Sequence, residues 1–117
     1  AWGAMVREAL NAAEQLKGDK IEVEVFDLRT ISPMDVETIV TSIRKTGRGV
    51  IVHEAPKTCG LGAEIIALIN EKALLSLQAP IERVTGFDIP FPLMKSDHYY
   101  LPNPERIVMA VKKVMSF

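Results

Sequence analysis

Residues 49–62 read Gly-Val-Ile-Val-His-Glu-Ala-Pro-Lys-Thr-Cys-Gly-Leu-Gly, and this stretch decides the fold class. The β-branched run at 50–52 is too short for a helix and is typical of a strand buried on both faces of a parallel sheet. His53 and Glu54 follow at the carboxyl end of this strand, the edge at which α/β proteins collect ligand sites. The stretch therefore predicts an α/β domain organised around one buried strand.

Apolar residues at helical spacing predict helices on both sides of this strand. The first predicted helix covers residues 4–16. The second begins with a Ser32 cap and ends at Gly47. The third covers residues 63 to about 77, and the last begins at Asn103-Pro104. In the second helix, Pro33 suits the first helical position and Asp35 the acceptor position of a capping box.

Two further strands are predicted. Residues 21–25 alternate apolar residues with glutamate, which is typical of a half-exposed strand, and the strand becomes more buried toward Leu28. Residues 81–85 form a short strand, followed by a proline-rich extended segment and a loop at 93–102. Alternating strands and helices predict one α/β domain with a mainly parallel sheet.

The composition is that of an ordinary globular domain, with 117 residues, 48% of them hydrophobic and 25% charged. The balance of 14 Lys and Arg against 15 Asp and Glu offers no electrostatic reason to expect nucleic acid or a membrane as partner. A single cysteine suits a reducing compartment, and a cytoplasmic location is expected. The start at Ala1-Trp2-Gly3, without an initiator methionine, is interpreted as a cut from a longer polypeptide.

The residues around the central turn have functional and structural interpretations. His53 and Glu54 are interpreted as groups that satisfy loop backbone atoms or pair across a subunit interface, since no triad-like arrangement accompanies them. Gly60 and Gly62 could cradle a phosphate before a helix. They lack both the GxGxxG and the Walker lysine pattern, which favours close packing against a neighbour. Cys59 is interpreted as a small loop residue rather than a reactive thiol.

The segment after the prolines carries further candidates. Tyr99 and Tyr100 are candidate subunit-interface anchors, because an aromatic ring with a polar tip suits a wet contact. Asp97 and His98 are potential metal ligands, but nothing nearby completes a zinc set, so a solvated loop is expected.

A series of motifs runs in order through nearly the whole chain. They are Phe-Asp-Leu-Arg-Thr-Ile-Ser-Pro-Met-Asp (26–35), Lys-Thr-Gly-Arg (45–48), His-Glu-Ala-Pro (53–56), Gly-Ala-Glu-Ile (62–65), Ala-Pro-Ile-Glu-Arg-Val-Thr-Gly (79–86) and Pro-Phe-Pro (90–92). Together they closely resemble the carboxyl-terminal domain of the beta subunit of thiamine-dependent 2-oxo acid dehydrogenases, the family of the pyruvate, branched-chain and acetoin enzymes. The resemblance implies a transketolase carboxyl-terminal-like fold, a three-layer α/β/α sandwich on a mixed, mainly parallel five-stranded sheet. The family's first strand, which runs into the Trp-Gly position, is expected to be missing here.

The resemblance also implies a function within a larger assembly. The family's alpha-beta heterotetramer decarboxylates a 2-oxo acid on thiamine diphosphate and acylates the lipoyl group of an acyltransferase core. There the alpha subunit holds the diphosphate and magnesium, and an upstream beta domain holds the pyrimidine. This chain is therefore expected to bind no cofactor and to be inactive alone. The implied partners are the alpha subunit, a second beta subunit and the small subunit-binding domain of the acyltransferase.

Docking of the acyltransferase is expected at the end of the chain. By the resemblance, the terminal carboxylate of Phe117 takes part, and so does the position before an Ala-Pro pair. That position is acidic in some members and is Gln78 here, which removes a charge. Lys112 suits the negative end of the last helix's dipole and is a further docking candidate.

Two other functions stay open. One is a domain of a different transketolase-like thiamine enzyme, which would be favoured by a single polypeptide carrying both thiamine-binding domains. The other is a stand-alone anion- or nucleotide-binding module that uses the glycine turn, which saturable nucleotide binding would favour.

Overall fold

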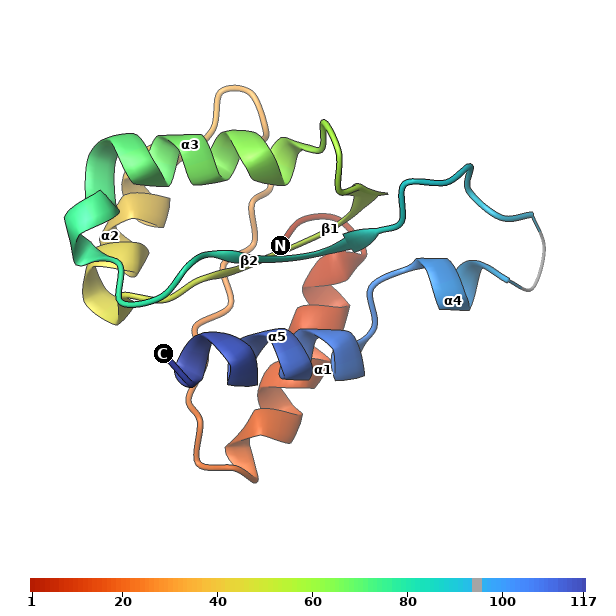
Figure 1. Ribbon diagram of the computed structural model, residues 1–117, viewed down its shortest axis with the longest axis horizontal. Coiled ribbons are helices and arrows are strands. Elements are labelled where there is room, and N and C mark those ends of the chain that lie inside the picture. The colour runs from red at the N-terminus through yellow and green to blue at the C-terminus, as the bar shows by residue number, and fades with distance from the viewer. Residues whose placement is uncertain (94–95) are drawn as a thin grey trace.

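The computed structural model describes residues 1–93 and 96–117. Along the chain it contains α1 (Met5–Lys17), α2 (Val36–Thr46), β1 (Val50–Pro56), α3 (Leu61–Ala73), the 3-10 helix η1 (Leu74–Ser76), β2 (Glu82–Gly86), α4 (Asp97–Tyr100) and α5 (Pro104–Met115). β1 and β2 pair in parallel between the helices, with Val52 opposite Val84 (Figure 1). None of the helices formed by the described residues is long and apolar enough to cross a membrane.

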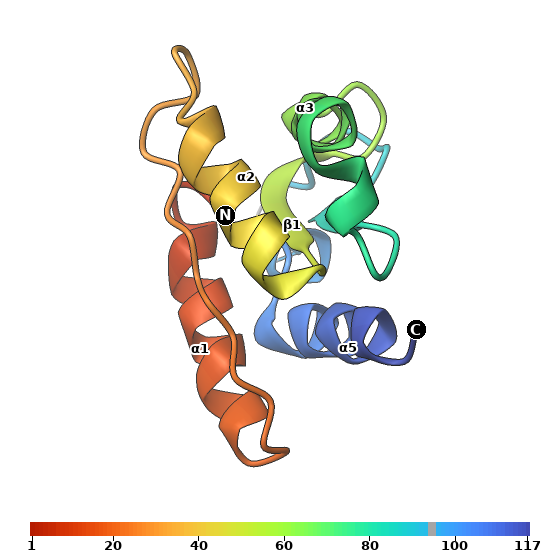
Figure 2. The same cartoon turned by 90° about the vertical axis from the view of Figure 1, so that its left-hand side faces the viewer.

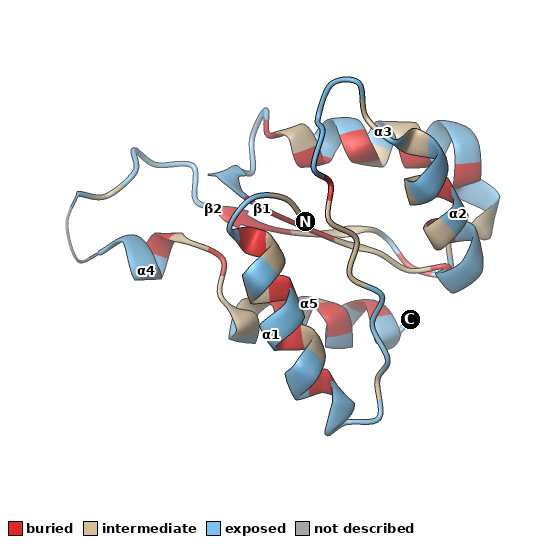
Figure 3. Cartoon of the chain, turned by 180° about the vertical axis from the view of Figure 1, so that it is seen from behind, coloured by how far each residue is buried: buried red, intermediate tan, exposed pale blue. Residues whose placement is uncertain are grey.

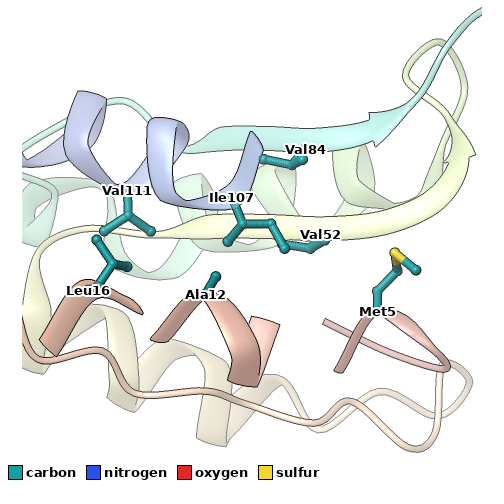
Figure 4. Packing of buried hydrophobic residues seen from close by; sticks show 7 residues of the cluster. All are labelled: Met5, Ala12, Leu16, Val52, Val84, Ile107 and Val111. Carbon is teal, nitrogen blue, oxygen red and sulfur yellow. The ribbon is translucent and has the colours of Figure 1, made fainter. Parts of the chain in front are cut away.

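The helices cover both faces of the strand pair and produce an α/β/α arrangement. Side chains of α1 and α5 pack with Val52 and Val84 on one face (Figure 4). On the other face α2 and α3 pack around Ile51 and Ile69. Ile51 and Val52 enter different cores because successive side chains of a strand point to opposite faces. The predicted α/β class and its three layers are confirmed.

Capping residues explain where two helices begin. The side chain of Asn103 accepts a hydrogen bond of 2.9 Å from the backbone N–H of Arg106, so α5 begins at Pro104 as predicted. The predicted helix start at Ser32 is wrong, because Asp35 is the cap and α2 begins at Val36. The Asp35 carboxylate accepts from both the backbone N–H and the hydroxyl of Thr38, and a carboxylate also matches the positive end of the helix dipole.

The helix predicted at 63–77 and the loop predicted at 93–102 both differ from the structure. α3 begins two residues earlier, at Leu61, and gives way at Leu74 to η1, which tightens the last turn. The predicted loop at 93–102 contains the short helix α4. Residues 94 and 95 of that loop lie outside the described residues.

The predicted strand at 21–28 is wrong, although the segment is present as a connection without regular structure. An apolar cavity of about 440 Å³ is lined both by this segment and by Val50 and Val52 of β1, so no neighbouring backbone pairs with it there. Its two ends have backbone partners: the Ile21 N–H donates to the Leu16 carbonyl at 3.1 Å, the α-amino group of Ala1 donates to the Phe26 carbonyl at 3.1 Å, and the Leu28 N–H donates to the Ala1 carbonyl at 2.9 Å.

This connection passes from one core to the other. Ile21 packs with the α1 and α5 core and Leu28 with the α2 and α3 core, and Figure 2 shows residues 21–30 on the outside of the fold. Within residues 1–93 and 96–117, the only paired strands are therefore β1 and β2, fewer than the family's five-stranded sheet without its first strand would provide.

Candidate functional site

His53 lies inside the fold rather than at an open strand end, because β1 continues to Pro56. The imidazole is 0% exposed and stacks on the indole of Trp2, with ring centroids 5.0 Å apart and an angle of 15° between the planes. Neither ring nitrogen has a partner in hydrogen-bonding geometry among the described residues. Burial lowers the pKa of His53, the backbone of Ala55 raises it by a smaller amount, and the positive charge of Arg83 lowers it further.

Gly60 and Gly62 allow the first turn of α3 to lie directly against this ring. A Cβ atom on Gly60 would be 2.4 Å from the Pro56 carbonyl oxygen and 2.7 Å from the His53 ring. A Cβ atom on Gly62 would be 2.8 Å from the Nε2 atom of His53. The two glycines therefore serve close packing, and the imidazole occupies the space beside the helix N-terminus that a phosphate would need.

The loop between β1 and α3 binds the carboxylate of Asp88, an anion that belongs to the chain itself. The backbone N–H and the hydroxyl of Thr58 donate to the Asp88 carboxylate at 3.0 Å and 2.6 Å. These two hydrogen bonds lower the pKa of Asp88. The same bonds connect this loop to the segment after β2, a contact that the sequence did not reveal.

Arg106 fastens the end of β2 to α4 and was not found by sequence reasoning. Its Nη2 atom donates to the Thr85 carbonyl at 2.6 Å, and Nη1 reaches the carbonyls of Tyr100 and Leu101 at 3.4 Å and 3.3 Å. The guanidinium also lies 4.7 Å from the ring centroid of Phe87. No spacing or motif around residue 106 predicts these contacts, because Thr85 and Phe87 are distant from Arg106 in sequence.

The arm, defined as residues 87–93 together with α4, projects beyond the strand pair in Figure 1. It exposes apolar side chains at every second position of its extended part: Phe87, Ile89, Phe91 and Leu93. Figure 3 shows most of the arm in the colour of exposed residues. Prolines at 90 and 92 separate these side chains and favour an extended backbone before any partner binds.

The two candidate tyrosines of the arm have different surroundings. Tyr99 is 76% exposed, whereas Tyr100 is 4% exposed beneath the rings of Phe87 and Phe91. His53, Gly60 and Gly62 are also buried within the chain, and Glu54 is exposed. Of the residues predicted for a subunit interface, only Glu54 and Tyr99 therefore offer exposed side chains.

The docking candidate Gln78 belongs to a small network that reaches the last turn of α5. Its side chain lies against Gly47, and its Oε1 atom accepts from the Nη1 atom of Arg48 at 2.5 Å. The Nε atom of Arg48 donates to the Val114 carbonyl at 3.0 Å. Arg48, which sequence reasoning did not single out, thus connects Gln78 to the C-terminal end of the chain.

The other two docking candidates differ in how firmly they are held. Phe117 is 66% exposed. Lys112 forms an ion pair of 2.8 Å with Asp19, so it links α5 to the end of α1 and not to Gln78. The structure therefore brings Gln78 and the chain end together through Arg48 and gives Lys112 a separate partner.

Two observations on the described residues bear on a metal ion or a phosphate-containing cofactor. No group of three or more His, Cys, Asp or Glu side chains within residues 1–93 and 96–117 is arranged to hold a metal ion. The turn with Gly60 and Gly62 is filled by His53, and its Thr58 donors are used by Asp88. We therefore derive no cofactor chemistry from these residues.

Comparison with known proteins gives a consistent result. The model of the family "Transketolase, C-terminal domain" matches residues 1–107. The chain is similar to the pyruvate dehydrogenase E1 component subunit beta of Bacillus subtilis (strain 168), with 46% identity over 116 residues. It is also similar to the subunit of the same name from Staphylococcus aureus (strain Mu50), with 47% identity over 116 residues. Each match covers 99% of this chain and 36% of the relative, so the chain spans about a third of their length.

A solved structure shares the fold. A split gene transketolase, an inactive beta4 tetramer, matches with a TM-score of 0.84 and 28% identity, covering 98% of this chain and 36% of that chain. The predicted transketolase-like fold is thereby confirmed for the described residues.

Proposed function

This chain belongs to the transketolase C-terminal domain family, and on that premise we propose that it is the assembly and acyltransferase-docking domain of a 2-oxo acid dehydrogenase beta subunit. The observation that carries the proposal is the similarity to pyruvate dehydrogenase beta subunits along almost the entire chain. In the complete cytoplasmic enzyme, the domain would pack against an alpha subunit and a second beta subunit. That heterotetramer would oxidatively decarboxylate a 2-oxo acid on thiamine diphosphate, with magnesium, and acylate a lipoyl group, while the cofactor is held by parts of the enzyme outside these residues.

We assign the docking of the acyltransferase to the surface around Gln78, Arg48 and the end of α5. Figure 2 shows the C-terminus close to the turn that follows α3, and the Arg48 hydrogen bonds hold these parts together. Apolar side chains stand exposed on both parts, with Leu75 100% and Phe117 66% exposed. Apolar anchors beside a carboxylate suit a small domain that brings a cationic side chain to the chain end.

Adding residues after Phe117 in the complete enzyme is expected to weaken binding of the acyltransferase subunit-binding domain by about ten- to hundredfold. The reason is that a charge-assisted hydrogen bond to the terminal carboxylate contributes about 1.5–3 kcal/mol, and a peptide bond at that position removes the charge. Titration calorimetry with the isolated subunit-binding domain measures the change. The same added residues at the N-terminus of the subunit are the control. Unchanged affinity with the C-terminal extension would remove Phe117 from the docking site.

We further propose that the domain is one part of a longer beta subunit whose preceding segment fills the cavity between residues 21–28 and β1. The hydrogen bonds of Ala1 to Phe26 and Leu28 follow the pattern of parallel strand pairing. A backbone extended in the direction before Ala1 would therefore run along residues 21–26, which line the cavity.

The 117-residue chain on its own is consequently expected to self-associate or to be marginally stable. An unpaired backbone edge beside an apolar cavity, together with the exposed apolar arm, favours contacts between copies. Light scattering of the purified chain over a range of concentrations checks this expectation. A stable monomer at all concentrations would contradict it.

Two other functions have less support than the proposed one. The similarity to a split gene transketolase favours, as a second candidate, a domain of another transketolase-like enzyme. The identity to that chain is 28%, however, against 46% and 47% for the dehydrogenase subunits. A stand-alone anion- or nucleotide-binding module has less support, since His53 fills the glycine turn. Saturable binding of a nucleotide by this chain would restore it.

A further inference from the structure

His53 is a titratable group that the proposed function does not use, and it joins three segments that are distant in sequence. Its own strand supplies one side of its surroundings, Trp2 of the N-terminal segment stacks on the ring, and Gly60 and Gly62 of the first turn of α3 touch its edge. With 0% exposure, the imidazole is a contact shared by these three segments, beside the packing of Trp2 against the core that contains Ile51 and Ile65.

The surroundings of the ring favour its uncharged form, because burial lowers the pKa of His53 by more than the backbone of Ala55 raises it. The charged group that faces it from β2 is the cationic Arg83 guanidinium, and in the 117-residue chain the α-amino group of Ala1 is a second, weaker cationic neighbour. The first turn of α3 presents glycine backbone and the positive end of the helix dipole. An added proton would therefore meet positive potential from β2 and from α3, opposed only by the backbone of Ala55, and neither ring nitrogen has an acceptor in hydrogen-bonding geometry among the described residues.

We propose that the Trp2–His53 stack is a pH-dependent contact that opens when the imidazole takes up a proton. The imidazolium has two N–H donors and a charge, and it can satisfy them only by reaching water. A Cβ atom on Gly60 or Gly62 would lie less than 3 Å from the ring, so the helix backbone is too close to leave room for water at this edge, and the ring must leave its place. Trp2 and the first turn of α3 then lose their common partner.

The direction of the pH effect follows from linkage. The pKa of His53 is lower in the folded chain than in the unfolded chain, where it is near the ordinary value of about 6.5. The unfolded chain therefore binds more protons as the pH falls below about 6.5, and the free energy of unfolding decreases in that range. Above that pH the contribution of the neutral ring is fully present. The inference concerns contacts within the chain and does not depend on the proposed function.

The composition of the chain makes the contact directly measurable, because it has one tryptophan and two histidines. Trp2 is therefore the only source of indole fluorescence, and His98, exposed on α4, is the only other imidazole. We expect a transition in the Trp2 emission, toward that of a water-exposed indole, with a midpoint below about pH 6.5. The variant His53→Phe, which keeps an apolar ring against Trp2, should lack the transition. His98→Gln is the matched control and should retain it.

A second measurement keeps the inference testable if His53→Phe does not fold. Histidine ring resonances of the unmodified chain, followed by NMR, give the titration of His53 without any substitution. The His53 resonances and the Trp2 emission should change over the same pH range, with faster amide exchange in the first turn of α3. The inference is overturned if His53 titrates without a change at Trp2, if His53 keeps an ordinary pKa, or if the fluorescence transition survives in a folded His53→Phe variant.

Discussion

Replacing Gly86 with alanine is expected to lower the free energy of unfolding by about 3 kcal/mol. A Cβ atom at this position would lie 2.3 Å from the Glu54 carbonyl oxygen and 2.5 Å from the ring of Tyr100. The first contact is with the backbone of β1, which cannot turn aside as a flexible side chain would. The methyl group must therefore separate the ends of the two paired strands and displace Tyr100 from beneath Phe87 and Phe91.

Urea unfolding of the two proteins measures this difference, and Gly18→Ala is the matched control. Gly18 has ordinary helical angles, and a Cβ atom there would be 3.4 Å from the Gln15 carbonyl, which is normal contact. The control substitution should leave stability within about 0.5 kcal/mol or raise it, because alanine restricts the unfolded chain. Equal effects of the two substitutions would show that the close approach at Gly86 is not a constraint.

Replacing Arg106 with methionine is expected to lower the free energy of unfolding by about 2–3 kcal/mol and to loosen the arm. The main loss is the hydrogen bond to the Thr85 carbonyl, followed by the weaker ones to Tyr100 and Leu101 and the contact with Phe87. Methionine keeps an unbranched apolar stem but donates no hydrogen bond. Urea unfolding gives the stability, and limited proteolysis within the arm reports the local effect.

Arg7→Met is the control for the loss of a charge, because Arg7 is exposed on α1. It should change stability by less than about 0.5 kcal/mol. Arg106→Lys separates charge from geometry, since lysine keeps the charge but cannot reach several carbonyls with a planar fork. It should recover only part of the loss, and a lysine variant with the stability and protease resistance of the original chain would show that the fork geometry is unimportant.

Local sequence signals predicted the elements whose causes are local. The Asn103-Pro104 start of α5, the closure of α2 at Gly47 and the β-branched run of β1 are all as expected, because each depends on neighbouring residues. The predicted start of α2 was wrong because two polar residues, Ser32 and Asp35, were both possible caps. Asp35 is the cap, and its carboxylate accepts a second hydrogen bond from the hydroxyl of Thr38.

Long-range contacts account for what sequence reasoning missed. The alternation at 21–25 is a correct sign of an extended chain, but a strand also needs a neighbouring backbone, and the cavity beside β1 provides none. Arg48 and Arg106 each bind backbone carbonyls from distant parts of the chain, and nothing in the sequence around an arginine identifies such carbonyls. The resemblance did indicate Gln78, yet its connection to Val114 through Arg48 emerged only from the fold.

The core between α1 and α5 also sets the order in which the domain can form as it leaves the ribosome. Met5 and Leu16 of α1 complete their contacts only with Ile107 and Val111 of α5 (Figure 4). The core on the opposite face is built from residues between Leu28 and Ala73, which are all synthesised earlier. The nascent chain can therefore close the α2 and α3 face first, while α1 keeps its apolar side uncovered until the last helix has cleared the exit tunnel.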